Sequence, residues 1–499
     1  MGYRLRGNPP LNQLSLIPQW RVVALTAVVC LLPFATAIHA AEALPCAQQA
    51  DAGMRSIVLP IDAENHIEIG VRIEDLEGEE VFDFHGDRNL VLASNNKLFT
   101  TAAALLALPA DYRWHTRSYL NGKTLRVVGG GDPSMRKIGE RDVTEEYLSA
   151  LAAALKKAGV SKLSVLELDP TIFDEQWRHP LWPSNQLQQT YCAPMSGLSL
   201  NGGCTQVRFR NNRFSTFPPL ASAIDWRRGN KVYPSLSAWL GKDDFQIHAR
   251  APQNGSAAEV EFAMKDPVQV FATWMRLGLQ RHGIGVEEIV ILDSAAVAAN
   301  PVAGSKAVHD WPSVWTVEEA VVACNKVSDN FLAECLLKTV GHEVLGEGSY
   351  ATGRQAIQDV FTQHEIEDLD FSQADGSGMA RQSGDPVNTS TPADLCRLLR
   401  EMAMREQGAA YFDSLPIAGV EGRLGKRFKD AAFKPQRVHA KTGFILGASS
   451  LSGYLLMPDD QIMVFSIVVN FSKRNPNTNN ARFKKMQEQL LERLIRNAM

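Results

Sequence analysis

The segment 94–105 reads SNNKLFTTAAAL and is the most informative stretch of the chain about its fold. The run from Leu98 to Leu108 is apolar on all sides and rich in good helix formers, which predicts a helix buried at the centre of a domain. Residues three apart on a helix share a face, so Lys97 can reach the hydroxyl of Ser94. Burial lowers the pKa of a lysine, and a neutral lysine can accept the proton of a serine nucleophile. Ser94 is therefore a candidate nucleophile, and a helix N-cap is its competing interpretation.

The Ser-x-x-Lys spacing occurs a second time, at Ser134 and Lys137, so the two-residue pattern alone is a weak signal. Context separates the two copies, because Ser134 follows Gly131-Asp132-Pro133, a sequence typical of turns. We therefore expect Ser134 to lie in a solvated loop and to take no part in catalysis.

Two further motifs follow along the chain. Ser328-Asp329-Asn330 lies in a region of helical periodicity, and Lys441-Thr442-Gly443 occurs once, in a predicted strand. The edge of a strand beside a serine offers a peptide backbone a surface to pair with. A Ser-x-x-Lys pair, Ser-Asp-Asn and Lys-Thr-Gly form the motif set of penicillin-binding proteins and class A β-lactamases.

The two ends of the chain share one style of hydrophobic patterning. Five strands are predicted, two in residues 66–84 and one each in 438–445, 449–456 and 462–469. Residues 317–340 and 391–404 predict helices. A last predicted helix, 483–495, carries an apolar stripe, and we expect it to pack on the sheet and not to serve as an amphipathic membrane foot.

The pattern changes between residues 109 and 307, where strands become frequent and helical periodicity weakens toward the middle. This segment is interpreted as an insertion into a domain that both ends of the chain build. The expected division is 45–108 and 308–499 for the catalytic domain, 109–203 and 265–307 for an inserted α/β domain, and 204–264 for a smaller β-rich domain nested in the insert.

Residues 1–40 are typical of a secretory signal peptide. Arg4, Arg6 and Arg21 are basic, the segment has no acidic residue, and the mostly apolar run 22–37 is followed by small residues. A transmembrane anchor is less favoured, because the run is shorter than the ~20 residues of a bilayer span. We therefore expect an exported, periplasmic protein with no stable membrane anchor after signal cleavage.

Charge and cysteines limit the partners. The formal net charge is −4 and becomes more negative without the arginines of the signal, which argues against a nucleic-acid partner. Of the seven cysteines, Cys192 and Cys204 are a plausible disulfide pair, whereas Cys324 and Cys335 are expected on one helix, too far apart to bridge each other. Neither Cys-x-x-Cys nor His-Glu-x-x-His occurs, so no metal or other cofactor is expected.

The motifs and the sequence around them resemble the D-alanyl-D-alanine carboxypeptidase/endopeptidase family, the class C low-molecular-mass penicillin-binding proteins. The matching stretches are 94–105 (SNNKLFTTAAAL), 129–133 (GGGDP), 193–201 (APMSGLSLN), 328–334 (SDNFLAE), 375–378 (DGSG), 414–419 (SLPIAG), 441–443 (KTG) and 450–454 (SLSGY). The resemblance implies an α/β (α+β) fold, in which a penicillin-binding/β-lactamase-like transpeptidase domain, an antiparallel sheet flanked by helices, is split by nested inserted domains.

The resemblance also implies a serine enzyme that cleaves peptidoglycan stem peptides and cross-links through an acyl-enzyme and binds β-lactams. In the family pattern Ser94 attacks the D-Ala carbonyl and Lys97 is its base. Ser328 passes the proton to the leaving amine with support from Lys441, and Asn330 holds the substrate backbone or Lys97. We expect Ser94 and Ser328 to lie within hydrogen-bonding distance of Lys97.

Thr442, Gly443 and Phe444 are the substrate-binding residues that the resemblance implies. Thr442 would bind the terminal carboxylate, and the backbone N–H groups of Ser94 and Phe444 would form the oxyanion hole. Phe444 departs from the family, which usually has a hydroxyl residue there. We expect a weaker grip on a free carboxylate and a bias toward endopeptidase activity, unless a neighbouring hydroxyl such as Ser449 substitutes.

Two other functions stay open at this stage. A non-catalytic peptidoglycan-binding protein with a decayed site would have Phe444 as its first sign of decay. A β-lactamase shares the motif set, but it does not need the 234 positions from Ser94 to Ser328, and the Glu-x-x-Leu-Asn loop of class A enzymes does not occur. The sequence does not determine the oligomeric state, and a homo-oligomer is compatible with it.

Overall fold

The structure is a computed structural model that describes residues 44–497, except 65, 303–305, 367, 381–387, 434–436 and 473–478, and without the side chains of 44–50. The expected signal segment, 1–40, lies outside the described residues. In the part of the chain that is described, no helix is long and apolar enough to cross a membrane.

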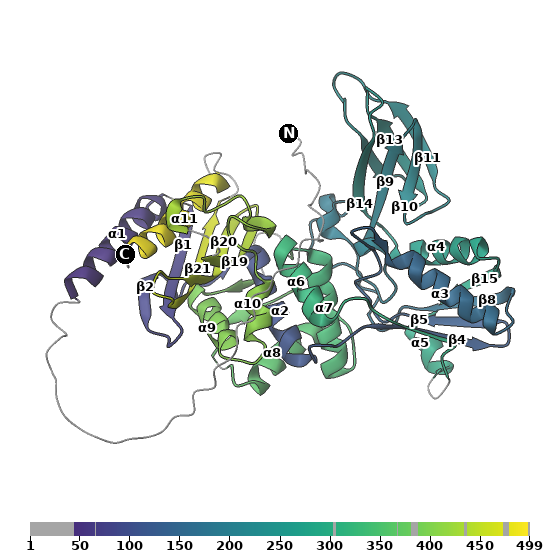
Figure 1. Ribbon diagram of the computed structural model, residues 1–499, viewed down its shortest axis with the longest axis horizontal. Coiled ribbons are helices and arrows are strands. Elements are labelled where there is room, and N and C mark those ends of the chain that lie inside the picture. Colours follow the sequence, from purple (N-terminus) through teal and green to yellow (C-terminus); the bar gives the residue numbers. More distant parts are fainter. Residues whose placement is uncertain are drawn as a thin grey trace.

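A five-stranded antiparallel sheet joins the two ends of the chain (Figure 1). Its strand order is β19-β20-β21-β1-β2, with β1 at Ile67–Asp75, β2 at Glu80–Phe84, β19 at Val438–Ile445, β20 at Ala448–Leu456 and β21 at Ile462–Phe471. The N-terminal strand β1 pairs with β21, with Val71 opposite Ile467. All five strands were predicted, because strand patterning is a local property of the sequence.

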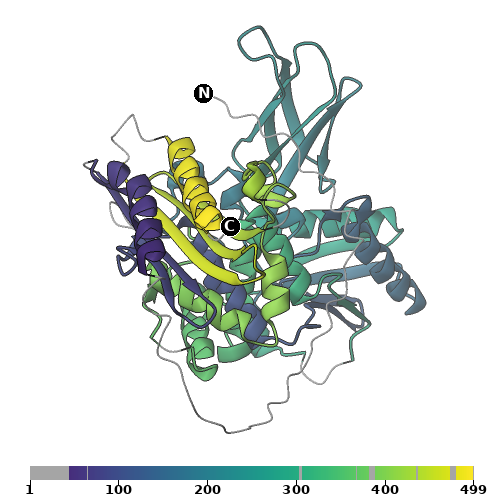
Figure 2. The ribbon, with the colours of Figure 1, turned by 60° about the vertical axis from the view of Figure 1, so that its left-hand side comes forward.

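Two terminal helices cover one face of this sheet. They are α1 (Leu44–Asp62) and α11 (Asn480–Asn497), which lie side by side in Figure 2. Phe483, Met486, Leu490 and Leu494 of α11 are buried in the core that it forms with the sheet. The prediction that this apolar stripe packs on the sheet is confirmed.

The other face of the sheet carries a group of helices around one central helix. They are α2 (Lys97–Ala107), α6 (Val317–Val327), α7 (Asn330–Leu345), α8 (Tyr350–Gln363), α9 (Pro392–Ala403) and α10 (Gly408–Ser414). Every residue of α2 except the last is buried, including Lys97 at its first position. The expectation of a central buried helix after Ser94 is confirmed, since an all-apolar helix is stable only when it is surrounded.

The predicted helix 317–340 is in fact two helices with a turn between them. Ser328 ends α6 in the left-handed conformation, with φ +63°, and the Asp329 side chain caps α7 by accepting from the N–H of Leu332. Cys324 and Cys335 therefore lie on separate helices, and the expectation that they share one was wrong. Apolar periodicity on both sides of the turn concealed this local break.

A second five-stranded sheet is built mainly from the middle of the chain, in the order β15-β8-β5-β4-β16. Its elements are β4 (His115–Asn121), β5 (Thr124–Val128), β8 (Lys162–Asp169), β15 (Gly285–Ile291) and β16 (His309–Pro312), with α3 (Val143–Lys157), α4 (Pro267–Arg281) and α5 (Ser294–Ala299) alongside. Strands β5, β8 and β15 are parallel, and α3 and α4 share one core with them.

A small two-sheet unit, residues 204–263, projects from the rest of the molecule (Figure 1). One sheet has the order β10-β9-β14 and the other β11-β13-β12. The strands are β9 (Cys204–Arg210), β10 (Arg213–Phe217), β11 (Ala223–Arg228), β12 (Ser237–Leu240), β13 (Gln246–Ala251) and β14 (Ala258–Ala263). Val207, Leu240, Ile247 and Phe262 fill the space between the two sheets.

The remaining strands are short. β3 (Leu90–Val91), β17 (Phe371–Ser372) and β18 (Thr389–Ser390) form a three-stranded sheet, and β6 (Lys137–Ile138) pairs with β7 (Arg141–Asp142). Strand β3 leads directly into the short 3₁₀ turn Ala93–Asn96 and then into α2. This connection sets the position of Ser94 relative to the main sheet.

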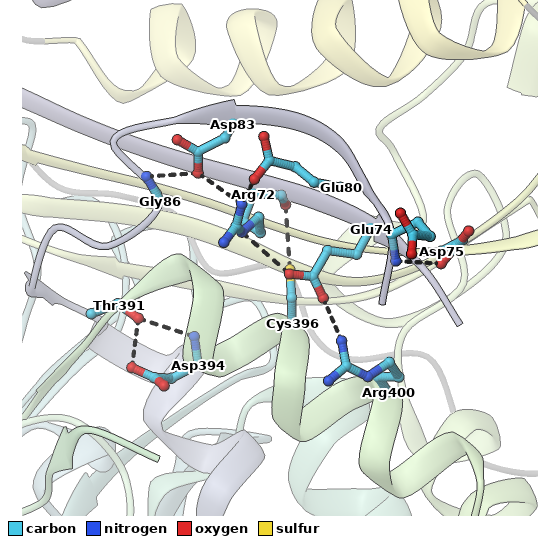
Figure 3. A network of polar contacts seen from close by, with 11 residues as sticks. Arg72, Glu74, Asp75, Glu80, Asp83, Gly86, Thr391, Asp394, Cys396 and Arg400 are labelled. Carbon is cyan, nitrogen blue, oxygen red and sulfur yellow. Dashed lines mark hydrogen bonds and ion pairs between the residues drawn. The ribbon is translucent and has the colours of Figure 1, made fainter. Parts of the chain in front are cut away.

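Ion pairs tie the main sheet to α9 (Figure 3). Glu74 of β1 pairs with Arg72 at 3.2 Å and with Arg400 of α9 at 2.8 Å. The thiol of Cys396 on α9 also donates to the backbone oxygen of Arg72 at 3.3 Å. Burial raises the pKa of Glu74, so the two arginines compensate a carboxylate that has lost most of its water.

The expected disulfide does not form. Cys192 and Cys204 are both buried free thiols, as are Cys324, Cys335 and Cys396. Twelve residues of separation allow a bridge, but the side chains must also meet in a narrow geometry, which only the folded chain decides.

Candidate active site

Ser94 and Lys97 meet where the 3₁₀ turn passes into α2. Lys97 Nζ donates to Ser94 Oγ at 3.1 Å, while Ser94 is half-buried and Lys97 has no exposed surface. The hydroxyl therefore lies at the border between a buried amine and the protein surface, where a substrate could reach it. This is the geometry of a nucleophile and its base.

Lys97 has two further acceptors. Its Nζ donates to Asn330 Oδ1 at 2.7 Å and to the backbone oxygen of Ser377 at 2.8 Å. Burial is the main influence on the amine and lowers the pKa of Lys97, although the carboxylates of Glu334 and Asp375 oppose the shift. A lowered pKa increases the fraction of neutral amine, which is the form that can accept a proton.

Ser328 and Lys441 form a second hydroxyl and amine pair. Lys441 Nζ donates to Ser328 Oγ at 2.7 Å and to the backbone oxygen of Thr442 at 3.0 Å. Burial, followed by the nearby charge of Lys97, lowers the pKa of Lys441. Among the described residues Ser328 forms no hydrogen bond with Lys97, so the expectation that both serines contact Lys97 holds only for Ser94.

Asn330 stands at the first position of α7, directly after the turn that holds Ser328. Its Oδ1 accepts from Lys97, and its Nδ2 donates to the backbone oxygen of Tyr191 at 2.8 Å. The structure thus places Asn330 on Lys97, one of the two roles that the family resemblance implies. Tyr191 comes from the middle of the chain and is 42% exposed, and sequence reasoning did not select it.

Gly443 allows strand β19 to approach the turn that carries Ser94. A Cβ on this residue would overlap Ser450 Oγ and would lie 2.7 Å from the backbone oxygen of Leu92. Any side chain here would push β19 away from the serine. The glycine of the Lys-Thr-Gly motif is therefore a packing requirement of the site.

The Phe444 ring points away from the core and is 53% exposed. Its strand partner Ser449 is buried and bonds Asn480 Oδ1 at 2.8 Å, while Ser450 bonds the backbone oxygen of Leu92 at 2.7 Å. The expectation that Ser449 could supply the missing hydroxyl is not supported, because that hydroxyl is buried and already has a partner.

Two buried carboxylates behind Lys97 were assigned no role from the sequence. Glu334 accepts from the N–H groups of Gly376 and Ser377, at 2.8 and 3.0 Å. Asp375 accepts from three backbone N–H groups of the same loop and from the indole of Trp182 at 2.7 Å. Together they hold the loop whose Ser377 carbonyl contacts Lys97. The matching stretches SDNFLAE and DGSG contained both residues, but only the fold brings them together.

Burial, followed by the neighbouring charge of Asp375, raises the pKa of Glu334 to about 8. The two backbone N–H groups that donate hydrogen bonds to Glu334 favour its charged form and so oppose the rise in its pKa. Its ionisation therefore depends on the loop staying in place, which couples the loop to the charge around Lys97.

Ser134 is buried, contrary to the solvated loop that its turn sequence predicted. Its hydroxyl donates to Asp132 Oδ1 at 2.6 Å and accepts from the N–H of Val314 at 3.1 Å. Lys137 is exposed and does not contact Ser134 among the described residues. The second Ser-x-x-Lys pair is therefore a coincidence of spacing, because Ser134 is in a turn, Lys137 is on the short strand β6, and the two do not share a helix face.

Within the described residues, no group of three or more His, Cys, Asp or Glu side chains could hold a metal ion. The chemistry available to the site is that of two hydroxyls, two buried amines and backbone N–H groups. Such a set can activate a serine and stabilise an oxyanion during acyl transfer.

The fold and this constellation define a serine acyl-transfer enzyme of the penicillin-binding class. The fold is similar to penicillin binding protein 4 from Haemophilus influenzae, with a TM-score of 0.71 and 21% identity over 89% of this chain and 98% of that one. A structure of that protein complexed with a β-lactam has a TM-score of 0.68 and 19% identity, over 89% and 98% of the two chains.

Sequence comparison defines the family. The chain belongs to the D-Ala-D-Ala carboxypeptidase 3 (S13) family, a family of serine peptidases, which it matches over residues 60–490. One relative is a D-alanyl-D-alanine carboxypeptidase from an Actinomadura species, 28% identical over 439 residues, which are 80% of this chain and 77% of the relative.

Proposed function

We propose that this protein hydrolyses the terminal D-alanyl-D-alanine bond of peptidoglycan stem peptides through an acyl-enzyme on Ser94. The observation that supports this most directly is the contact between a fully buried Lys97, whose pKa burial lowers, and a half-buried serine hydroxyl. The names of the relatives in the family agree with this substrate.

In acylation, neutral Lys97 takes the proton from the Ser94 hydroxyl while Ser94 Oγ bonds to the carbonyl carbon of the penultimate D-alanine. The N–H groups of Ser94 and Phe444 stabilise the resulting oxyanion, and such donors typically contribute ~3 kcal/mol each. The C–N bond then breaks, and the proton returns to the leaving amine by way of Ser328, next to Lys441. Water hydrolyses the ester in the second half of the reaction, with Lys97 as the base.

The remaining substrate contacts follow from β19. The strand edge at Gly443 would pair with the backbone of the peptide, and the Thr442 hydroxyl would bind its terminal carboxylate. Cleavage of cross-links is also proposed, because Phe444 stands where the family usually has a second hydroxyl for the terminal carboxylate, and its ring is exposed. Cross-linked peptides have no carboxylate at that point and so do not need the missing hydroxyl. A β-lactam would acylate the same serine.

The proposed location is the periplasm, reached through the signal in residues 1–40. The proposed division keeps a catalytic domain from both chain ends, an inserted α/β domain and a nested β-rich domain. One boundary is moved beyond Pro312, because β16 pairs with β4 of the second sheet.

Labelling with fluorescent penicillin tests the function. The wild type should form a covalent adduct, Ser94→Ala should form none, and the matched control Ser134→Ala should label as the wild type does if it stays folded. A wild type that never labels would support a non-catalytic peptidoglycan-binding protein, and rapid release of hydrolysed penicillin would support a β-lactamase. Labelling that survives Ser94→Ala would show that another residue is the nucleophile.

A further inference from the structure

The outer face of the sheet β11-β13-β12 carries cations and aromatic rings that belong to no site described so far. Ile247, Ala249 and Ala251 of β13 are buried toward the facing sheet. Side chains alternate along a strand, so His248 and Arg250 point to the opposite, outer face. The pairing of the strands aligns Trp239, His248 and Asp225 in one row and Ser237, Arg250 and Arg227 in the next.

The rings on this face are organised by stacking. The guanidinium of Arg250 lies 4.2 Å from the centre of the Tyr233 ring and 5.7 Å from that of Trp239. The Trp239 ring also stacks on His248, with centres 5.8 Å apart. Trp239 is 38% exposed and Tyr233 52% exposed, so the ordered rings still offer much of their area to a ligand.

The charge on this face is unbalanced. Among the described residues, neither Arg227 nor Arg250 forms an ion pair, whereas the one carboxylate in the two rows, Asp225, lies 3.3 Å from His248. Two guanidinium groups are therefore free to bind anions, and guanidinium groups bind carboxylates with two parallel hydrogen bonds. Exposed rings beside them suit the apolar faces of flat, ring-shaped groups.

We propose that this outer face, defined by Arg227, Tyr233, Trp239, His248 and Arg250, is a second binding site for the peptidoglycan polymer. The arginines would bind carboxylates of the stem peptides, and Tyr233 and Trp239 would stack on sugar rings of the glycan strand. This inference rests on the proposed function, which supplies a substrate that is itself a polymer of sugars with carboxylate-bearing peptides.

Such a site would hold the enzyme on its polymer between turnovers. The small two-sheet unit projects from the body of the molecule, away from β19 and α2 (Figure 1). A second contact on the same polymer raises the effective concentration of stem peptides at Ser94 without changing how one short peptide is bound. The site should therefore matter for insoluble peptidoglycan and not for soluble peptides.

Co-sedimentation of the full-length mature protein with purified peptidoglycan sacculi tests the proposal. Arg227→Ala/Arg250→Ala should reduce the affinity for sacculi at least about tenfold, and raised salt should remove most of the wild-type advantage. The matched control is Arg210→Ala/Arg213→Ala, which removes the same charge from exposed residues at the other sheet of the unit and should bind as the wild type does. Trp239→Ala should also weaken binding to sacculi, and raised salt should change the size of this loss little.

The same variants should hydrolyse a soluble D-Ala-D-Ala pentapeptide, and label with penicillin, at the wild-type rate. Normal thermal unfolding of each variant excludes misfolding as the cause of lost binding. The proposal is overturned if Arg227→Ala/Arg250→Ala binds sacculi normally, if both double variants lose binding equally, or if the face binds lipid vesicles or another protein in place of sacculi. If the wild type neither hydrolyses the soluble pentapeptide nor labels with penicillin, the proposed function is overturned, and the binding to sacculi can still be interpreted.

Discussion

Replacement of Phe444 by threonine should increase carboxypeptidase activity relative to cleavage of cross-links. The change puts a hydroxyl on β19, one residue after Gly443, where the family usually has one. The exposed ring can be replaced at low structural cost, because it contributes little to the core. The new hydroxyl can donate to the terminal carboxylate of a pentapeptide, whereas a cross-linked peptide has no carboxylate at that point.

The expected size of the effect follows from the absence of a substitute hydroxyl. Ser449 and Ser450 are both buried and already hydrogen-bonded, so we expect neither to replace this contact in the wild type. A hydrogen bond to a charged group contributes roughly 1.5–3 kcal/mol, which corresponds to about 10- to 150-fold in kcat/KM. Thr442 remains in both enzymes, so the wild type should retain measurable carboxypeptidase activity.

The assay compares kcat/KM for a D-Ala-D-Ala pentapeptide with kcat/KM for a cross-linked dimer, in the wild type and in Phe444→Thr. Val81→Thr is the control, because it places a threonine on β2, at the opposite edge of the same sheet. An unchanged ratio of the two values in Phe444→Thr, or a ratio that moves toward the dimer, would show that Phe444 does not set the preference.

Three further variants test the site. Lys97→Arg should lower the rate of penicillin acylation about 10²- to 10⁴-fold, because arginine stays protonated, and an active arginine variant would exclude Lys97 as the base. In the wild type, the acylation rate should rise with pH and level off below the ordinary lysine pKa of 10.5. Gly443→Ala should slow acylation and lower the melting temperature, because the new Cβ would overlap Ser450 and the backbone of Leu92. The expected loss in the free energy of unfolding is about 1–3 kcal/mol. An unchanged acylation rate would contradict the packing requirement. Glu334→Gln should lower kcat more than it changes KM and should shift the pH profile of acylation. The reason is that the amide has one acceptor oxygen, whereas two backbone N–H groups each donate to a separate oxygen of Glu334. A loss of stability with a wild-type pH profile would indicate a purely structural role.

Much of the site could be predicted because each motif lies on one local element. Ser94 and Lys97 are neighbours on a helical turn, and Lys441, Thr442 and Gly443 follow one another on a strand whose bounds were predicted correctly. Local context misled in one respect, because the turn sequence before Ser134 predicted a solvated loop. The serine is in fact buried, and Lys137 lies exposed on the short strand β6.

The strands of the main sheet, the buried helix after Ser94 and the candidate catalytic residues could all be predicted from the sequence, because periodicity and motif spacing are properties of short segments. Which groups meet across long separations is visible only in the folded chain. Lys97 and Asn330 are 233 positions apart, and Lys97 and the Ser377 carbonyl 280. Such contacts, like the burial that lowers the pKa of Lys97 and leaves Cys192 and Cys204 unbridged, depend on how distant elements pack, and packing is the outcome of the whole fold.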